Sequence, residues 1–309
     1  MDILQAIGNT TLVQLRKLVP AESAEIFVKL EWENPTGSLK DRMAKAVILL
    51  AEQSGRLQPG DTVVEYTGGS TGASLALVCA AKGYRLQIVS SDAFSHKKLD
   101  QMAAMGAELM LVPSEGGLTT RKLILNMIET ARELSHRPCT YWVDQLNNQD
   151  SLVGYYLLGE EIWNQTNGEI DAFVHCVGTG ASSRGVATVL KRHKPGIQII
   201  VVEPAESSVL LGGQAGAHQI EGVGIGYIPP LWEPKMVDEI IPVKTADAKE
   251  MARSLAHEEG FFAGTSSGAN VVAALQVARR LGKGAKIVTL MADSGLKYLD
   301  TDVYSSRSE

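Results

Sequence analysis

Lys40 lies where a loop with the sequence PTGSL, residues 35–39, leads into a helix with periodic apolar positions. A lysine at such a place can serve as an ordinary solvated charge, as a phosphate contact or as a covalent catalyst. A catalytic lysine of the third kind attacks a carbonyl group and forms a Schiff base. The rest of the chain has to discriminate among the three uses.

The loop Thr67–Thr71, with the sequence TGGST, directly follows an apolar strand pattern and precedes a helix. Backbone N–H groups at a helix N-terminus bind anions, and the hydroxyls of Thr67, Ser70 and Thr71 add donors. The same sequence also fits an ordinary glycine turn with a capping hydroxyl. On its own, this loop leaves both interpretations open.

A second loop of this kind, GTGASS at residues 178–183, follows the strand pattern IDAFVHCV and enters another helix. Glycine permits close approach of the backbone to a phosphate, while Thr179 and Ser182 can donate hydroxyls. The loop has neither the glycine spacing of a dinucleotide fingerprint nor a Walker lysine. It is a candidate phosphate cup of another type. His175, in the preceding strand, is interpreted as a satisfied core histidine.

Two further loops contain glycine near polar side chains. Residues 221–226 read EGVGIG, a run that suits either backbone packed against a flat ring or a tight irregular crossing. Residues 292–295 read ADSG and end the last strand pattern. Ser294 in that turn is either a helix cap or a hydrogen-bond partner for a ligand atom.

Composition and missing motifs argue against several other classes. The formal net charge of -6 disfavours a nucleic-acid or acidic-membrane partner. The three cysteines form no CxxC pair and the sequence has no HExxH motif, so we expect no metal ion. No signal-peptide pattern and no apolar run of membrane-spanning length occurs, so the expected location is a reducing cytoplasm.

The elements that position these loops alternate between strand and helix. Strand patterns such as DTVVEY and AKIVTLMA alternate with helical patterns such as KDRMAKAVILLAEQSG and LTTRKLILNMIETARELS nearly to the end of the chain. This order predicts two doubly wound α/β domains with mainly parallel central sheets. The least regular segment, 139–154, and the turn at Lys40 are the predicted domain crossings. Ligands in such folds lie at the carboxyl ends of strands.

One cofactor accounts for a lysine combined with hydroxyl-lined anion loops. Pyridoxal phosphate (PLP) needs a lysine for its Schiff base, a phosphate cup and a partner for its pyridine nitrogen. Lys40, the loop 178–182 and Ser294 could meet these three needs. The loop 67–71 could grip the carboxylate of an amino-acid substrate.

Six sequence blocks then carry a resemblance to a known family. They are ENPTGSLKDRMA, GGSTGASLALVCAAKG, GTGASSRGVA, EGVGIGYIPP, EEGFFAGTSSGA and MADSGLKYL. Together they resemble the cysteine synthase (O-acetylserine sulfhydrylase) and cystathionine β-synthase family of fold-type II, tryptophan synthase β-like PLP enzymes. The resemblance implies PLP in a cleft between two domains. Residues 1–40 plus 146–309 would form the larger, PLP-binding domain, and residues 41–145 the smaller, mobile, substrate-binding domain.

The resemblance also implies roles for single residues. Lys40 would be the Schiff-base residue and would remove and return the proton at the substrate Cα. The implied cofactor-binding residues are Lys40, Ser70, Gly178, Thr179, Gly180, Ser182 and Ser294. The implied substrate-binding residues are Thr67, Gly68, Thr71, Gln145 and Gly222. A serine rather than a carboxylate at position 294 would leave the pyridine nitrogen largely unprotonated, which favours β-elimination and β-replacement.

The implied reaction is β-replacement, with L-cysteine formed from O-acetylserine and sulfide by a homodimer. Alternatives are a cystathionine β-synthase-like enzyme, another replacement or elimination on serine derivatives, and a non-catalytic regulatory binding protein of the same fold. A nicotinamide oxidoreductase is a more remote alternative. The chain departs from the family pattern at Gly68, where the family has Ser, and at Ser70, where it has an Asn that contacts the cofactor's 3'-oxygen. These departures leave the leaving group and the nucleophile open.

Overall fold

The computed structural model describes residues 2–117 and 120–305, and the chain forms two compact units. The first unit comprises Met1–Ile7 and Lys40–Gly154, and the second comprises Gly8–Leu39 and Tyr155–Glu309. The predicted assignment of cofactor binding to 1–40 plus 146–309, and of substrate binding to 41–145, stays a prediction.

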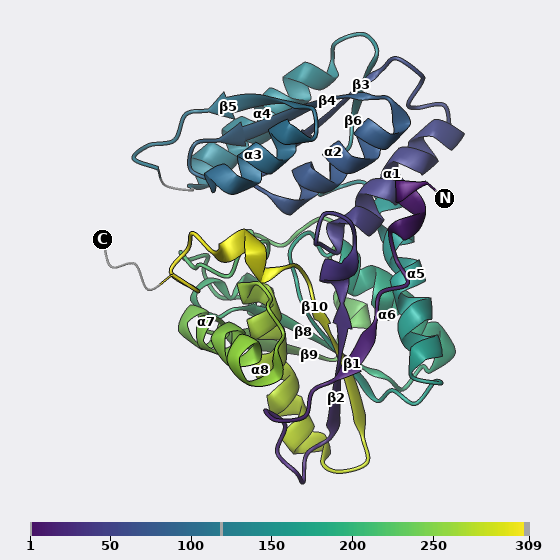
Figure 1. The fold of residues 1–309 in the computed structure, drawn as a ribbon, viewed down its shortest axis with the longest axis vertical. Helices are drawn as coiled ribbons and strands as arrows, with labels where there is room; N and C mark the ends of the chain where they lie inside the picture. The colour runs from purple at the N-terminus through teal and green to yellow at the C-terminus, as the bar shows by residue number, and fades with distance from the viewer. Residues whose placement is uncertain (1, 118–119, 306–309) are drawn as a thin grey trace. The chain divides into compact units, whose positions relative to one another are not determined.

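The first unit is built on a four-stranded parallel sheet in the order β5-β4-β3-β6. In Figure 1, α2 and α3 lie on one side of these strands and α4 lies on the other. The elements are α1 (Lys40–Gln53), β3 (Thr62–Tyr66), α2 (Ser70–Lys82), β4 (Arg85–Ser91), α3 (His96–Ala104), β5 (Ala107–Val112), α4 (Arg121–Ser135) and β6 (Thr140–Trp142). The first two residues of the helix predicted from Leu118 lie outside the described residues.

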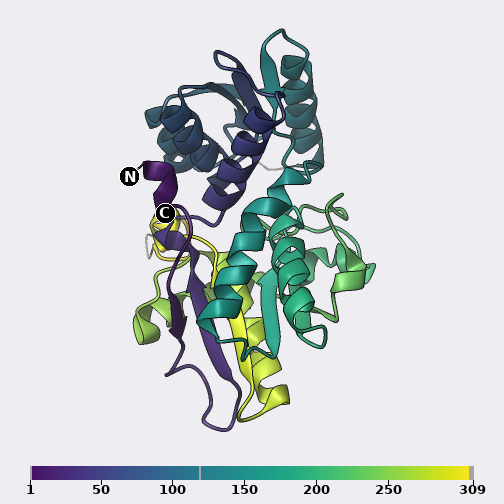
Figure 2. The same ribbon diagram turned by 90° about the vertical axis from the view of Figure 1, so that its right-hand side faces the viewer.

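The second unit is built on a six-stranded sheet in the order β1-β2-β10-β7-β8-β9. Figures 1 and 2 show α7 and α8 on one side of this sheet and α5 and α6 on the other. The elements are β1 (Leu12–Gln14), β2 (Glu25–Leu30), α5 (Asp150–Gln165), β7 (Ala172–Cys176), α6 (Ala181–His193), β8 (Gln198–Pro204), β9 (Glu239–Val243), α7 (Thr245–Ser254), α8 (Thr265–Leu281) and β10 (Lys286–Met291). A π-helical turn, Leu255–Glu259, continues α7.

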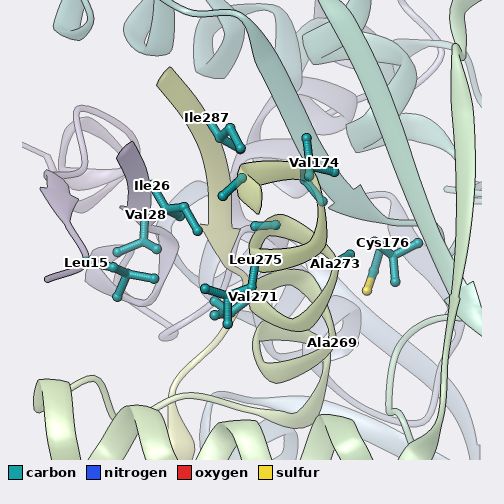
Figure 3. Close-up of a cluster of buried hydrophobic side chains, with 14 of the residues drawn as sticks. Leu15, Ile26, Val28, Val174, Cys176, Ala269, Val271, Ala273, Leu275 and Ile287 are labelled. Carbon is teal, nitrogen blue, oxygen red and sulfur yellow. The ribbon is translucent and has the colours of Figure 1, made fainter. Parts of the chain in front are cut away.

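Both sheets are mainly parallel, which confirms the prediction from the βαβ alternation. Within the described residues, β1 and β2 are the antiparallel pair among the named strands. The core of the second unit joins apolar residues of β2, β7 and β10 to small residues of α8 (Figure 3). Ala269 and Ala273 on α8 are fully buried, and their small side chains let the helix lie close to the sheet.

Residues 139–154, predicted to be the least regular segment of the chain, contain one short strand and the start of a helix. Thr140–Trp142 forms β6, and α5 begins at Asp150, so the boundary between the two units falls inside this helix. Gly154 and Gly159 lower the helix propensity of α5. They are required by packing, because a Cβ on Gly154 would lie 2.3 Å from the backbone oxygen of Arg42. No helix in the described part of the chain is long and apolar enough to cross a membrane.

Candidate active site

The turn before Lys40 is fixed to the carboxyl end of β10. Leu39 donates its backbone N–H to the carbonyl of Ala292 at 2.9 Å, and Ser294 donates its own to the carbonyl of Gly37 at 3.0 Å. The residue that precedes Lys40 and the predicted pyridine partner Ser294 therefore belong to hydrogen-bonded backbone segments. Lys40 itself is half-buried and begins α1.

The first turn of α1 is also fixed within its own unit. Asp41 accepts a hydrogen bond from the hydroxyl of Ser74 at 2.5 Å, and both side chains are fully buried. Ser74 lies on α2, the helix that follows the loop Thr67–Thr71. A buried hydrogen bond to a carboxylate is stronger than a neutral one, so it holds the start of α1 against α2.

The predicted phosphate loop lies between β7 and α6. Gly180 is the N-cap of α6 with φ 86°, a left-handed conformation that favours glycine, and the hydroxyl of Thr179 accepts the backbone N–H of Ala181 at 3.4 Å. No acidic residue lies in the first turn, so the N-terminal N–H groups and the positive end of the helix dipole favour an anion there. The hydroxyl of Ser182 lies in the first turn of this helix.

The phosphate loop packs directly against the glycine run at 222–226. A Cβ added to Gly178 would lie 2.3 Å from the carbonyl oxygen of Gly222, so a larger residue at Gly178 would push the two loops apart. Gly224 also donates its backbone N–H to the carbonyl of Val177 at 3.1 Å. The structure therefore brings together Gly178 and Gly222, which the sequence assigned to cofactor and substrate binding respectively.

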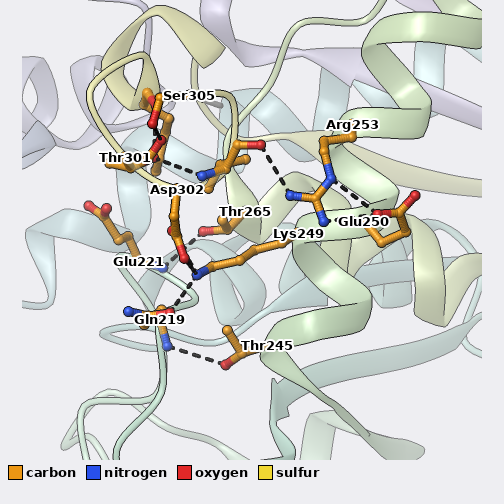
Figure 4. Close-up of polar contacts among 12 residues, drawn as sticks. Gln219, Glu221, Thr245, Lys249, Glu250, Arg253, Thr265, Thr301, Asp302 and Ser305 are labelled. Carbon is orange, nitrogen blue, oxygen red and sulfur yellow. Dashed lines mark hydrogen bonds and ion pairs between the residues drawn. The ribbon is translucent and has the colours of Figure 1, made fainter. Parts of the chain in front are cut away.

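A polar cluster holds the chain just before Gly222 (Figure 4). Glu221 donates its backbone N–H to the hydroxyl of Thr265 at 3.1 Å. Lys249 on α7 donates to the side-chain oxygen of Gln219 at 2.5 Å and forms an ion pair with Asp302 at 2.6 Å. This cluster, Gln219–Lys249–Asp302, ties the segment to α7 and to the C-terminal part of the second unit.

Ser294 has the hydrogen-bonding state that a ring-nitrogen partner needs. Its hydroxyl oxygen accepts the backbone N–H of Leu296 at 3.2 Å, as the N-cap of a short 3-10 helix. A serine hydroxyl has one proton to donate and two lone pairs with which to accept. Its proton can therefore be donated to an acceptor such as an unprotonated pyridine nitrogen.

The predicted substrate loop is assembled within the first unit. Thr71 donates its hydroxyl proton to the side-chain oxygen of Gln145 at 2.8 Å, and the Gln145 amide donates to the carbonyl of Tyr66 at 3.1 Å. Gly69 donates its backbone N–H to the hydroxyl of Thr67 at 3.1 Å, and no side chain caps the α2 N-terminus at Gly69. Thr67, Ser70, Thr71 and Gln145 thus come together around one helix N-terminus.

Glu65 supports this loop and was not predicted as a functional residue. It is fully buried and accepts the backbone N–H groups of Tyr66 at 3.0 Å and Gln145 at 3.1 Å. Burial raises the pKa of Glu65 from 4.5 to about 8, although both N–H groups favour the ionised form. An acidic residue within the apolar run DTVVEY was the signal that could have identified it.

Phe94 fills the space beside Gly68, where the family carries a serine. A Cβ on Gly68 would lie 2.4 Å from the nearest atom of the Phe94 ring. Phe94 is half-buried and precedes α3. The Phe94 ring therefore occupies the space that the family's serine side chain would need. The sequence spacing alone gave no sign of this contact.

A mainly parallel sheet, a glycine-rich helix N-terminus after β7, and a turn before Lys40 that is hydrogen-bonded at the end of the neighbouring strand β10 fit a lysine-dependent enzyme that binds a phosphorylated cofactor. The family described as pyridoxal-phosphate dependent enzyme matches residues 3–293. The chain belongs to this family and is a PLP-dependent enzyme, and its fold is confirmed as that of a fold-type II member.

The similar proteins include a cysteine synthase of Staphylococcus aureus (strain Mu50 / ATCC 700699). It is 42% identical over 306 residues, which cover 98% of this chain and 97% of that protein. A crystal structure of cysteine synthase from Entamoeba histolytica has a TM-score of 0.92 at 38% identity, covering 100% of this chain and 91% of that one. An O-acetylserine dependent cystathionine β-synthase from Helicobacter pylori has a TM-score of 0.92 at 33% identity, covering 99% of both chains.

Proposed function

We propose that the chain is a cysteine synthase that forms L-cysteine and acetate from O-acetyl-L-serine and sulfide. In this reaction the bond from Cβ to the acetate oxygen breaks and a bond from Cβ to sulfur forms. The observation that carries the proposal is the anchoring of the Lys40 turn and Ser294 at the end of β10, beside the strand that leads into the phosphate loop. The similarity to cysteine synthases over nearly the whole chain supports it.

The residues of the second unit fit a PLP phosphate and ring. The N-terminus of α6, with Gly178, Thr179, Gly180 and Ser182, would hold the phosphate. Ser294 would donate its hydroxyl proton to the pyridine nitrogen. When bound, PLP supplies an electron sink that stabilises negative charge at the substrate Cα.

Lys40 would have two tasks. Its amine would hold the cofactor as the Schiff-base residue, and the same amine would act as the base that removes the substrate Cα proton and later returns it. The fixed turn before Lys40 and the Asp41–Ser74 hydrogen bond would restrict where this amine can reach.

The loop in the first unit would bind the substrate carboxylate. Backbone N–H groups at the start of α2 and the hydroxyls of Thr67 and Thr71 provide donors, and Gln145 orients Thr71. Gly68 would contribute backbone without a side chain, and Gly222 would border the substrate from the loop packed against Gly178. Ser70 would contact the cofactor, with a shorter side chain than the asparagine of the family.

A second candidate is β-replacement with a larger thiol, such as homocysteine. The similarity to an O-acetylserine dependent cystathionine β-synthase supports this alternative. We further propose a homodimer in a reducing cytoplasm, in agreement with the three free cysteines. Light scattering would measure the oligomeric state.

The test is a product assay on purified protein supplied with PLP. O-acetylserine is combined with sulfide or homocysteine in parallel, and cysteine and cystathionine are quantified by mass spectrometry. Cysteine formation that is lost in Lys40→Ala, but kept in the matched surface variant Lys283→Ala, supports the proposal. Turnover with homocysteine and none with sulfide would replace it with the second candidate.

A further inference from the structure

His175 contacts the predicted phosphate loop from inside the sheet. Its Nε2 atom lies 2.9 Å from the hydroxyl oxygen of Ser182, and the two residues are 3% and 8% exposed. The sequence indicated a core histidine, and the residue is indeed buried. Its hydrogen bond, however, goes to a hydroxyl in the first turn of α6 and not to a purely structural partner.

The side chain of Asn270 on α8 has a fixed orientation behind this histidine. Its Oδ1 atom accepts the backbone N–H of Cys176 at 2.7 Å, and its Nδ2 atom donates to the carbonyl of Leu290 at 2.8 Å. A backbone N–H can only donate and a carbonyl can only accept, so the amide cannot be turned over. The contact lies just beyond Val174 and Thr289, the last paired residues of β7 and β10.

The orientation of Asn270 determines which ring nitrogen of His175 carries the proton. The Nδ2 atom of Asn270 lies 3.3 Å from Nδ1 of His175 and is a donor, so Nδ1 has to be the acceptor. A neutral imidazole has one donor and one acceptor nitrogen, which places the proton on Nε2. The other tautomer, or an imidazolium, would set an N–H group against the amide N–H of Asn270.

The Nε2–H group of His175 then donates to Ser182, and this fixes what Ser182 can do. Because the hydroxyl oxygen accepts from His175, the hydroxyl proton of Ser182 has to be donated to a different group. A hydroxyl that accepts a hydrogen bond is also a stronger donor, because chains of hydrogen bonds polarise one another.

We propose that Asn270 and His175 are positioning residues that commit the Ser182 hydroxyl to donate a hydrogen bond to the PLP phosphate. The inference rests on the proposed role of Ser182 in the phosphate cup. The chain of contacts runs from Cys176 and Leu290 at the ends of β7 and β10, through Asn270 and His175, to the first turn of α6. Backbone groups of the sheet therefore determine that the Ser182 hydroxyl acts as a donor toward the phosphate.

The first test measures the tautomer in the wild-type holoenzyme. A long-range proton–nitrogen correlation spectrum of protein carrying isotope-labelled histidine distinguishes protonated from unprotonated ring nitrogens, and the signal missing in His175→Gln assigns the residue. We expect Nε2 protonated and Nδ1 unprotonated. A proton on Nδ1 would overturn the proposal, whatever the variants do.

The second test measures the dissociation constant of PLP from reconstituted apoprotein. Ser182→Ala should weaken binding about tenfold or more, because hydrogen bonds to charged groups are among the stronger ones. His175→Phe should weaken binding several-fold, and His175→Gln, which keeps a side-chain N–H donor, should restore most of the affinity. In the Ser182→Ala background, His175→Phe should cause no further loss, because His175 acts through Ser182.

The outcomes separate the two proposals. If Ser182→Ala leaves PLP affinity unchanged, the assignment of Ser182 to the phosphate cup fails. If Ser182→Ala weakens binding but the effect of His175→Phe is the same in both backgrounds, the phosphate cup stands and the positioning role fails. The wild-type tautomer decides the positioning role even if His175→Phe does not fold.

Discussion

Restoring the family's serine at position 68 should destabilise the first unit, because the new side chain would clash with the ring of Phe94. The added Cβ would lie 2.4, 2.5 and 2.7 Å from three atoms of the Phe94 ring. Optimal carbon–carbon separations are about 3.5–4.0 Å, so the ring has to move by about 1 Å or more. The φ of Gly68 is not left-handed, so the substitution adds no backbone strain and only the steric clash contributes to the cost. Overpacking of this kind costs about 1–3 kcal/mol, and we expect Gly68→Ser to fall in this range.

A double-mutant cycle isolates that contact. Phe94→Ala removes the ring, so Gly68→Ser should cost little in that background, and the coupling energy should be at least about 1 kcal/mol. The assay is urea unfolding of the four proteins, with equal slopes required. Gly196→Ser is the matched control, because a Cβ there meets nothing within 4 Å and its φ is not left-handed. Additive effects of the two changes would refute the reasoning.

Three further predictions concern the parts that support the site. Between the unfolded pKa of 4.5 and the folded value of about 8, the folded state keeps a proton on Glu65 that the unfolded state has lost. Stability should therefore fall by about 1.4 kcal/mol per pH unit as pH rises through this range, and urea unfolding of Glu65→Gln should lack this component. Gly178→Ala should weaken PLP binding about tenfold or more, since its Cβ would lie 2.3 Å from the Gly222 carbonyl oxygen. An unchanged dissociation constant for PLP would contradict the inferred close packing of the two loops. Lys249→Met should speed amide hydrogen exchange around Gln219, measured by mass spectrometry, because the hydrogen bond that holds this segment is lost.

The alternation of strand and helix patterns predicted much of the fold, because each pattern follows from local periodicity. The helix that begins at Lys40 and the strands Arg85–Ser91 and Gln198–Pro204 occur where the sequence indicated them. The loops Thr67–Thr71 and 178–183 also lie where expected, between a strand and the following helix, because that position is set by the chain order of βαβ units.

Tertiary contacts decided what the sequence could not show. The π-helical end of α7 and the start of α5 depend on packing against other elements, and β9 contains Pro242, which lowers its strand signal. The sequence around His175 and Phe94 gives no sign of a role for either residue. Only the fold shows that His175 contacts Ser182 and that Phe94 lies beside Gly68. The roles assigned to the single site residues stay predictions that the experiments above address.

The most direct test of the central claim is to locate the covalent lysine. The holoenzyme is reduced with borohydride, digested and mapped by mass spectrometry, with Lys40→Ala treated in parallel. The account predicts one phosphopyridoxyl group on Lys40 and none on the peptides of the variant. A label on another lysine, or no label on protein that has bound PLP, would contradict the assignment of Lys40.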